Sequence, residues 1–385
     1  MAINLSILNS KKDIEQEKEP DSNKSEISLI DKINNYLLKF SKVPLKERLF
    51  FVQHLGVMLR SGISISVAIK TLAKQTRNKY FLSILNDVGA VVEKGTSLAE
   101  SLKPHEKVFG ELFINMIEAG ESSGKLEEVL HELFIQMKKE HALISKVKGA
   151  LTYPAVILLA MVGIGTFMLI FVVPKITEMF ADFDAELPLP TKILIAVSNG
   201  IAQNGILSAI IAAIIIFSFY KILKTHKGKF IFQKILLKTP VFGPIIVKIN
   251  LARFARNISS LLKTDIMIIK TFQITASVLG NLHYRAALEE MAQRIKKGEK
   301  LSETIEKYPK LFTPVVVQMV AIGEETGELD NILVELAEFY EGEVDLIMDN
   351  LPSIIEPLLI LALGLGVGGV AVAIIMPMYS LTTAI

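Results

Sequence analysis

The chain has 385 residues, of which 51% are hydrophobic, and its formal net charge is only +2. This near-balance of charge provides no basic field for binding nucleic acid. The absence of cysteine excludes disulfides, thiolate zinc sites and cysteine nucleophiles, and the length allows two or three domains.

Residues 1–42 form the first segment, which is polar and charged and contains no apolar run of signal-peptide length. Such a composition predicts a flexible tail, because it offers too little apolar surface to offset the entropy of ordering. Insertion into a membrane is therefore expected to use internal segments.

Residues 43–150 form a region of helical periodicity. In LKERLFFVQHLGVMLRSG the apolar residues Leu49, Val52, Leu55 and Leu59 recur every three or four positions. Further runs of this kind follow, and alternating β patterns are absent. We expect a cytoplasmic antiparallel bundle of about six helices, the last of which runs toward the membrane.

Three strongly apolar segments come next, each long enough to cross a bilayer as a helix: 151–173, 201–220 and 354–376. The alternative is a set of buried core helices in a soluble domain, which their length disfavours. Residues 221–353 repeat the helical periodicity and predict a second cytoplasmic bundle. The expected fold class is an all-α polytopic membrane protein with two homologous helical bundles and three transmembrane helices.

The charges beside the apolar segments predict their orientation. Lysines are frequent just before residue 151 and just after residue 220, whereas residues 174–200 carry more acidic than basic side chains. Because basic flanks stay in the cytoplasm, we expect the N-terminus and both bundles there. Residues 174–200 and 377–385 are then expected on the other side of the membrane.

The chain is an internal duplication. At an offset of 203 residues, AGESSGKLEEVL at 119–130 aligns with IGEETGELDNIL at 322–333. The same offset superposes the first apolar segment on the third, and the second has no counterpart. The second segment therefore serves to return the chain, so that both copies have the same orientation.

The most similar part of the two copies is a Gly-Glu-x-[Ser/Thr]-Gly-x-Leu motif. A phosphate-binding loop needs four residues between its glycines, but this motif has three, and Lys125 of the first copy is Glu328 in the second. We interpret the motif as a tight interhelical turn whose glutamate caps the next helix. The candidate turn or partner-contact residues are Gly120, Glu121, Gly124 and Leu126 in the first copy and Gly323, Glu324, Gly327 and Leu329 in the second.

No constellation for catalysis, cofactor binding or metal binding is found, so the sequence predicts a protein that is not an enzyme. The histidines lack ligand spacing, and neither a nucleophile elbow nor a dinucleotide fingerprint occurs. Acidic residues near the motif, such as Glu118 and Glu325, could hold a divalent cation or meet a basic partner. A solvated turn with capping roles is the favoured alternative.

Small residues and prolines mark the positions expected to pack in the membrane. Gly364 and Gly368 form a small-xxx-small face suited to close helix packing, within the protein or with another membrane helix. Pro154 and Pro357 occupy equivalent positions in the two copies, near the start of the first and third apolar segments.

These features together resemble the inner-membrane platform proteins of type II secretion systems and type IV pilus machines, the GspF/PilC family. The resemblance covers about residues 45–385. Besides the duplicated motif it is carried by LTYPAV (151–156), FADFDAELPLPTKILIAVS (180–198) and IIEPLLIL (354–361). The segment QMVAIGEETGELDNILVELAEFYEGEVD at 318–345 is closer to the pilus branch than to the secretion branch.

The resemblance implies a non-enzymatic platform that couples a cytoplasmic hexameric ATPase to insertion or removal of pilin subunits in a type IV pilus machine. The alternative is the platform of a type II secretion system, which handles pseudopilins. A multi-pass protein of the bacterial inner membrane is implied, with 174–200 and 377–385 in the periplasm. Expected partners are the assembly ATPase, with a retraction ATPase as a further candidate, pilin or pseudopilin subunits and other inner-membrane assembly proteins. A homo-oligomer is also implied, and a dimer is favoured.

Two other classes are disfavoured by the residues themselves. A transporter would need ionisable groups within its spans, and Glu356, at the start of the third apolar segment, is interpreted as interfacial. A membrane-bound signalling enzyme would need a catalytic constellation, which is not found.

Overall fold

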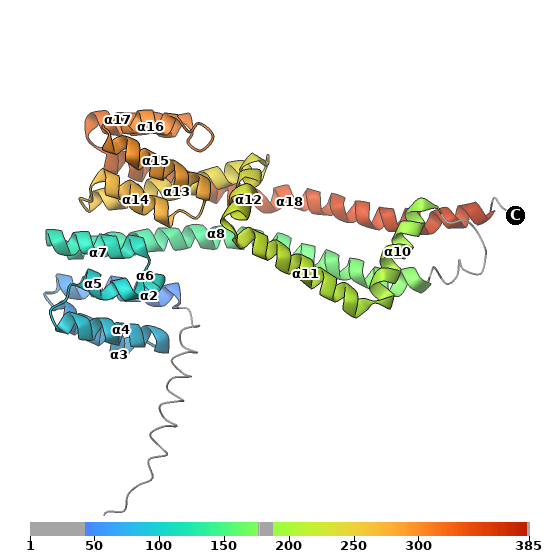
Figure 1. Ribbon diagram of the computed structural model, residues 1–385, viewed down its shortest axis with the longest axis horizontal. Helices are drawn as coiled ribbons and strands as arrows, with labels where there is room; N and C mark the ends of the chain where they lie inside the picture. Colours follow the sequence, from blue (N-terminus) through green and yellow to red (C-terminus); the bar gives the residue numbers. More distant parts are fainter. Residues whose placement is uncertain (1–42, 176, 178–187, 383–385) are drawn as a thin grey trace, which may run out of the picture.

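The computed structural model describes residues 43–175, 177 and 188–382. The predicted tail at 1–42, residues 178–187 of the predicted loop and residues 383–385 lie outside the described ranges. All regular secondary structure in those ranges is helical, which confirms the all-α fold class (Figure 1).

The first copy of the repeat folds as a helical bundle around an aromatic core. Rings of Phe51, Phe81 and Phe109 meet pairwise with centroids 5.8 to 6.0 Å apart. The helices are α2 (Leu45–Arg60), α3 (Ile65–Gln75), α4 (Lys79–Glu93), α5 (Leu98–Leu102), η1 (Lys103–His105), α6 (Glu106–Phe109), α7 (Glu111–Ser123) and the first part of α8 (Leu126–Phe167).

The second copy repeats both the bundle and its core. The counterparts of the three phenylalanines are Phe254, Tyr284 and Phe312. The ring centroid of Phe312 lies 5.0 Å from that of Phe254 and 5.5 Å from that of Tyr284. Burial raises the pKa of the Tyr284 phenol, which donates to the carbonyl of Leu311. The helices are α13 (Phe242–Lys263), α14 (Ile268–Val278), α15 (Leu282–Lys296), α16 (Leu301–Glu306), α17 (Pro314–Thr326) and the first part of α18 (Leu329–Thr382).

The last helix of each domain continues into the apolar half of the molecule. From α8 the helix passes through a π-helical turn, η2 (Met168–Val172), so that it is continuous over Leu126–Lys175. The expected boundaries at 150 and 353 fall inside α8 and α18, and no break separates domain from apolar segment. α18 also continues past the expected end at 376, through Pro377, to Thr382.

Among the described residues, two helices are long and apolar enough to cross a membrane by themselves, and a third span is reached only if a bent pair of helices is counted as one. Leu126–Lys175 and Leu329–Ala373 qualify singly, and α12 (His226–Lys238) with α13 qualifies as a pair bent by 110°. However, α13 lies in the core of the second domain. The span expected at 201–220 falls mostly on α11 (Gly205–Lys224), where Leu207, Ile216 and Tyr220 are among the exposed apolar side chains, and its crossing of the membrane stays a prediction.

The segment expected to be a loop at 174–200 is largely helical where it is described. α10 covers Leu189–Gln203, so the prediction of a loop is wrong for this part. An apolar helix of 11 residues, Thr191–Ile201, is too short to span a bilayer of about 30 Å hydrocarbon thickness.

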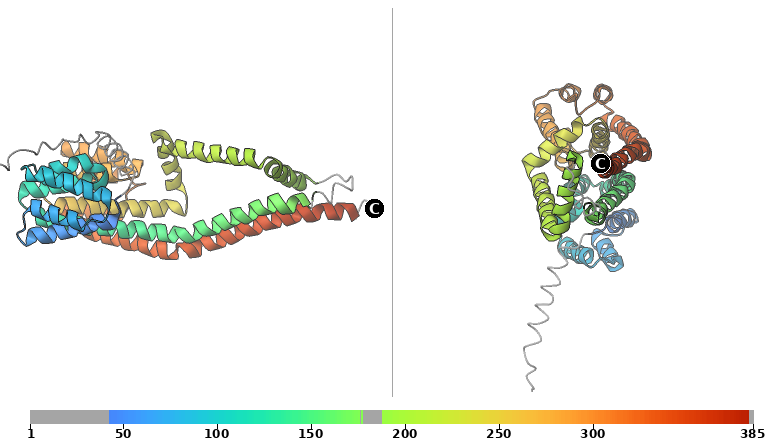
Figure 2. Two further views of the ribbon diagram at one scale, coloured as in Figure 1. Left: turned by 90° about the horizontal axis from the view of Figure 1, so that it is seen from below. Right: turned by 90° about the vertical axis from the view of Figure 1, so that its right-hand side faces the viewer.

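The two domains are stacked at one end of the molecule, and α8 and α18 run side by side to the other end (Figures 1 and 2). α10, α11 and α12 return the chain along a separate path. A small apolar cluster forms where α8, α13 and α18 converge, and it includes Leu143, Ile245, Val344, Met348 and Leu351. This cluster fixes the two long helices to each other below the domains.

Candidate functional site

The repeated motif forms the turn between the last two helices of each domain. Gly124 follows the end of α7 and has a left-handed φ of +71°. Gly327 has a φ of +77° at the matching turn between α17 and α18. A side chain makes this conformation costly, so the backbone requires the second glycine of the motif.

The first glycine of the motif allows the two helices to touch. A Cβ built on Gly120 would lie 2.9 Å from Cγ2 of Val129 and 3.1 Å from Cα of Leu126. At Gly323 it would lie 3.0 Å from Cα of Leu329. The leucine of the motif is therefore packed against the glycine, and a larger residue there would push the helices apart.

The glutamate of the motif caps a short helix elsewhere in its domain. In the first copy the carboxylate of Glu121 accepts hydrogen bonds from the backbone N–H of Leu98, at 2.5 Å, and of Ala99, at 2.8 Å. These are the first two residues of α5. The negative charge therefore meets the positive end of a helix and two of its otherwise unpaired donors.

The second copy repeats this cap. Glu324 accepts from the backbone N–H of Leu301 at 2.8 Å and of Ser302 at 3.2 Å, and from the Ser302 hydroxyl at 2.9 Å. The expectation that the glutamate caps the next helix is thus wrong in both copies. The capped helix begins 23 residues earlier in the chain, and it is brought to the glutamate because α5 packs on α7 and α16 on α17.

Lys125, which gave the motif its likeness to a phosphate site, instead connects the two domains. Its Nζ lies 2.6 Å from Oδ2 of Asp265 in the second copy, and this hydrogen bond and the charge of Asp265 raise the pKa of Lys125. Asp265 has a φ of +59° at the position where the first copy has Gly62, with a φ of +79°. The ion pair needs the lysine of the first copy and the aspartate of the second, because their counterparts, Glu328 and Gly62, cannot form it.

The acidic residues near the motif are dispersed. Glu118 lies 3.9 Å from Lys103 on its own domain. Among the residues that the structure describes, no group of three or more His, Asp or Glu side chains is arranged to hold a metal ion. Contact of the motif with a partner stays a prediction.

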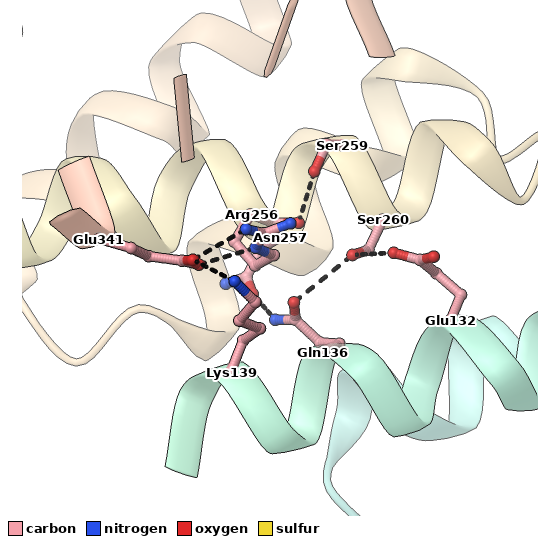
Figure 3. A network of polar contacts seen from close by, with 8 residues as sticks. All are labelled: Glu132, Gln136, Lys139, Arg256, Asn257, Ser259, Ser260 and Glu341. Carbon is pink, nitrogen blue, oxygen red and sulfur yellow. Dashed lines mark hydrogen bonds and ion pairs between the residues drawn. The ribbon is translucent and has the colours of Figure 1, made fainter. Parts of the chain in front are cut away.

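A polar network between the domains was not predicted. α8 of the first domain lies against α13 of the second, and Figure 3 shows the side chains that meet there. Gln136 donates to Asn257, and the Ser260 hydroxyl lies 2.7 Å from Oε1 of Glu132 and 3.4 Å from Oε1 of Gln136. Gln136, Asn257 and Ser260 are buried, and these hydrogen bonds offset the desolvation of their polar atoms.

Glu341 extends this network to α18 (Figure 3). Its carboxylate accepts two hydrogen bonds from the Arg256 guanidinium, at 2.8 and 2.9 Å, and one from Nζ of Lys139, at 3.2 Å. The Arg256 side chain is only 7% exposed and that of Glu341 16%. Three helices are therefore tied together just before α8 and α18 leave the domains.

The sequence contains one signal for this interface that pattern analysis missed. α13 is buried on nearly all sides between Leu251 and Leu261, yet it carries Arg256 and Asn257. Polar residues on a helix with no solvated face indicate a second neighbour that supplies hydrogen-bond partners. Recognising this requires knowledge that the helix is buried all round, which one sequence does not provide.

The apolar ends of α8 and α18 enclose a groove together with α10. The groove has a volume of about 450 Å³ and is lined mainly by apolar residues, among them Met168, Ile193, Val197, Gly366 and Val370. It adjoins the π-helical turn η2, and such turns frequently lie at functional sites.

Two buried hydroxyl groups hold α10 beside this groove. Thr191 donates to the carbonyl of Ala373 on α18, and Ser198 donates to the carbonyl of Leu169 in η2, each at 2.6 Å. Hydrogen bonds of this kind within a bilayer contribute about 0.6 to 2 kcal/mol each. α10 is thus fastened to both long helices.

The packing positions expected in the membrane lie largely outside the groove. Gly364 and Gly368 are exposed, and a Cβ on either would meet nothing within 4 Å. Pro357 is also exposed, whereas Pro154 is buried. Packing of Gly364 and Gly368 on a helix of another protein stays a prediction.

Comparison with known proteins agrees with the duplication and with the resemblance. The family described as "Type II secretion system (T2SS), protein F" matches twice, at residues 51–174 and 254–377. The chain is 35% identical to the type IV pilus assembly protein PilC of Thermus thermophilus over 88% of this chain and 83% of that protein. Identity is 34% with PilC of Myxococcus xanthus, over 90% and 83%. With the type II secretion system protein F of Aeromonas hydrophila it is 29%, over 91% and 90%.

Proposed function

The chain belongs to the type II secretion system protein F family, and from this premise we propose that it is the inner-membrane platform of a type IV pilus machine. In this role it couples a cytoplasmic hexameric ATPase to the insertion or removal of pilin subunits. It acts by transmitting displacement and catalyses no reaction.

The continuity of α8 and α18 is the observation that supports this proposal most. Each begins in the core of a domain and proceeds without interruption into an apolar segment, over 50 and 45 residues. At a rise of about 1.5 Å per residue, such helices reach roughly 70 Å. A displacement imposed on a domain by an ATPase therefore reaches the membrane through a stiff element.

The apolar groove offers a binding site for the pilin subunit that is to be inserted or removed. Its lining of small and aliphatic residues, including Gly165, Gly366 and Gly369, suits close contact with an apolar helix. The N-terminal helix of a pilin subunit held in the membrane would be such a ligand. A movement of α18 relative to α8 would change the groove and so the hold on that helix.

The pilus branch is favoured over the secretion branch by the degree of similarity. The two PilC relatives named above are 35% and 34% identical to this chain, and the type II secretion relative is 29% identical. We propose pilin as the membrane partner, with an assembly ATPase, a retraction ATPase, other inner-membrane assembly proteins and a second copy of the chain as further partners.

Deletion of the gene is expected to abolish surface filaments, because no other part of the machine would retain the pilin during assembly. The measurement is a filament count by electron microscopy, with secreted protein assayed in the same strain and plasmid complementation as the control. Intact filaments with blocked secretion would assign the protein to the type II secretion branch instead.

The proposed topology places both domains in the cytoplasm and the α10 end of the molecule in the periplasm. Because the chain has no cysteine, single introduced cysteines report their side of the membrane. An impermeant thiol reagent added to intact spheroplasts is expected to label Asp184→Cys but not Lys300→Cys, an exposed position at the start of α16. Labelling of Lys300→Cys before lysis would contradict the topology.

A further inference from the structure

The two domains of the chain contact each other head to tail. The α13/α14 side of the second domain packs on the α7/α8 side of the first (Figure 1). Leu261 and Ile274 of the second domain join the core of the first. Such a heterologous contact uses different surfaces on its two sides, so each domain retains the surface that the other has buried.

The first domain retains an uncovered counterpart of the α13/α14 surface. At an offset of 203 residues, Asn257 and Ser260 correspond to His54 and Val57 on α2. Ser260 is fully buried, whereas Val57 is 57% exposed. The α2/α3 face, as we name this surface, consists of Phe50, His54, Val57, Ile63 and Val67, of which all but the partly buried His54 are exposed.

The second domain retains an uncovered counterpart of the α7/α8 surface. Gln136, which is 4% exposed, corresponds to Phe339 on α18, which is 52% exposed. Ala119 is partly buried on α7, and its counterpart Ile322 on α17 is 50% exposed. With Val315, these residues form the α17/α18 face, which is apolar and open to water.

We propose that the α2/α3 face of one chain docks on the α17/α18 face of a second copy of the chain, in the head-to-tail manner seen between the two domains. The chemistry of the pair supports this occupant, because Ser260 and Gln136 are both replaced by apolar residues. Glu132, the other partner of Ser260, by contrast remains an acid in Glu335, which is exposed. Inside the chain the central contact is polar, Ser260 with Gln136. At the free faces the equivalent residues are Val57 and Phe339, which are both apolar and would be covered by each other.

The charged contacts change in the same concerted way. Within the chain Arg253 pairs with Glu140 at 2.7 Å. The counterparts are Phe50 and Glu343, and Glu343 is already paired with Lys248 of its own domain. Docking would therefore leave no carboxylate of this pair without a cation.

Two chains related in this way close into a ring of four domains if each contact turns the next domain by about a quarter turn, and otherwise they continue as an open stack. Each chain supplies one α2/α3 face and one α17/α18 face, so in the closed ring two reciprocal contacts use all four faces. This inference rests on the proposed dimer and specifies its surfaces, and it is independent of the role of the ATPase.

The test is cross-linking of the full-length chain in native membranes, with Val57→Cys and Phe339→Cys in the same chain and a short bismaleimide as the reagent. We expect a covalent dimer and no larger species. Lys125→Cys with Asp265→Cys, an exposed pair whose contact between the domains is seen within one chain, is the positive control and should give an internal cross-link. The matched negative control is Asp87→Cys with Phe339→Cys, because the counterpart of Asp87 is Glu290, which pairs within its own domain with Arg294.

Charge substitutions provide a second measurement that does not depend on cross-linking geometry. Val57→Glu is expected to lower dimer affinity roughly tenfold or more, since it would bury a carboxylate against Phe339. Phe339→Lys in the same chain is expected to restore the dimer.

The outcomes separate this inference from the broader proposals. A dimer that neither cross-links through this pair nor responds to Val57→Glu would overturn the docking surfaces while leaving the dimer in place. A ladder of larger species would overturn the closed ring. A chain that stays monomeric, for example because residues 1–42 of the same chain cover α2, would overturn both the surfaces and the dimer, and the filament count remains a separate test of function.

Discussion

Replacing Glu341 with alanine is expected to destabilise the protein by about 3–5 kcal/mol, because it would leave the buried Arg256 guanidinium without its carboxylate. The melting temperature of the full-length chain in detergent would measure this loss. Glu93→Ala is the matched control, since Glu93 pairs with Lys70 on the surface, where both side chains are more than half exposed. We expect that variant to melt with the parent chain.

The cause can be separated from simple loss of contact by removing both charges. The double variant Arg256→Met, Glu341→Leu replaces the ion pair with apolar side chains and is expected to be more stable than Glu341→Ala alone. Lys139 is 43% exposed and can be solvated without its partner. Equal melting temperatures for Glu341→Ala and Glu93→Ala would show that the network contributes little to holding the three helices together.

Replacing Gly120 with alanine is expected to destabilise the first domain by about 1–3 kcal/mol, although alanine normally stabilises a helix interior. The new Cβ would lie 2.9 Å from Val129 and 3.1 Å from the backbone of Leu126, so α7 and α8 must separate. Gly323→Ala is expected to act in the same direction, with Leu329 as the obstacle. Melting of the full-length chain in detergent again provides the measurement.

Gly342→Ala is the control for this prediction. Gly342 lies in α18, and a Cβ built on it meets nothing within 4 Å, so alanine should raise stability by up to about 1 kcal/mol. If Gly120→Ala were stabilising to the same degree, the close approach of α7 and α8 would not be the reason for the first glycine of the motif.

Local patterns and the repeat were sufficient to predict the helical class, the duplication and the apolar segments. Helical periodicity and uncharged length are properties of contiguous residues, and they survive folding unchanged. The segment around α10 was misjudged for a related reason. Residues 189–200 were predicted as part of a loop, because an apolar run between a proline-rich stretch and the next span is too short to indicate a membrane helix of its own.

The contacts of Glu121 and Gln136 could not be predicted in the same way. A capping rule looks for the helix next to the carboxylate, but the helix capped by Glu121 begins 23 residues before it. The partners of Gln136 are more than 120 residues away. Such contacts follow from how the domains stack, and the local pattern of one sequence does not specify that stacking.

Lys146 and Asp349 occupy the same position in the two copies, and they face each other across α8 and α18 with Nζ and Oδ1 2.8 Å apart. An assembly of identical single repeats would have to place lysine beside lysine there, or aspartate beside aspartate, and the charges would repel. Fusion of the repeats into one gene removes that constraint, because each copy can mutate alone. Duplication thus allows opposite charges to evolve at a place where symmetry would have forbidden them.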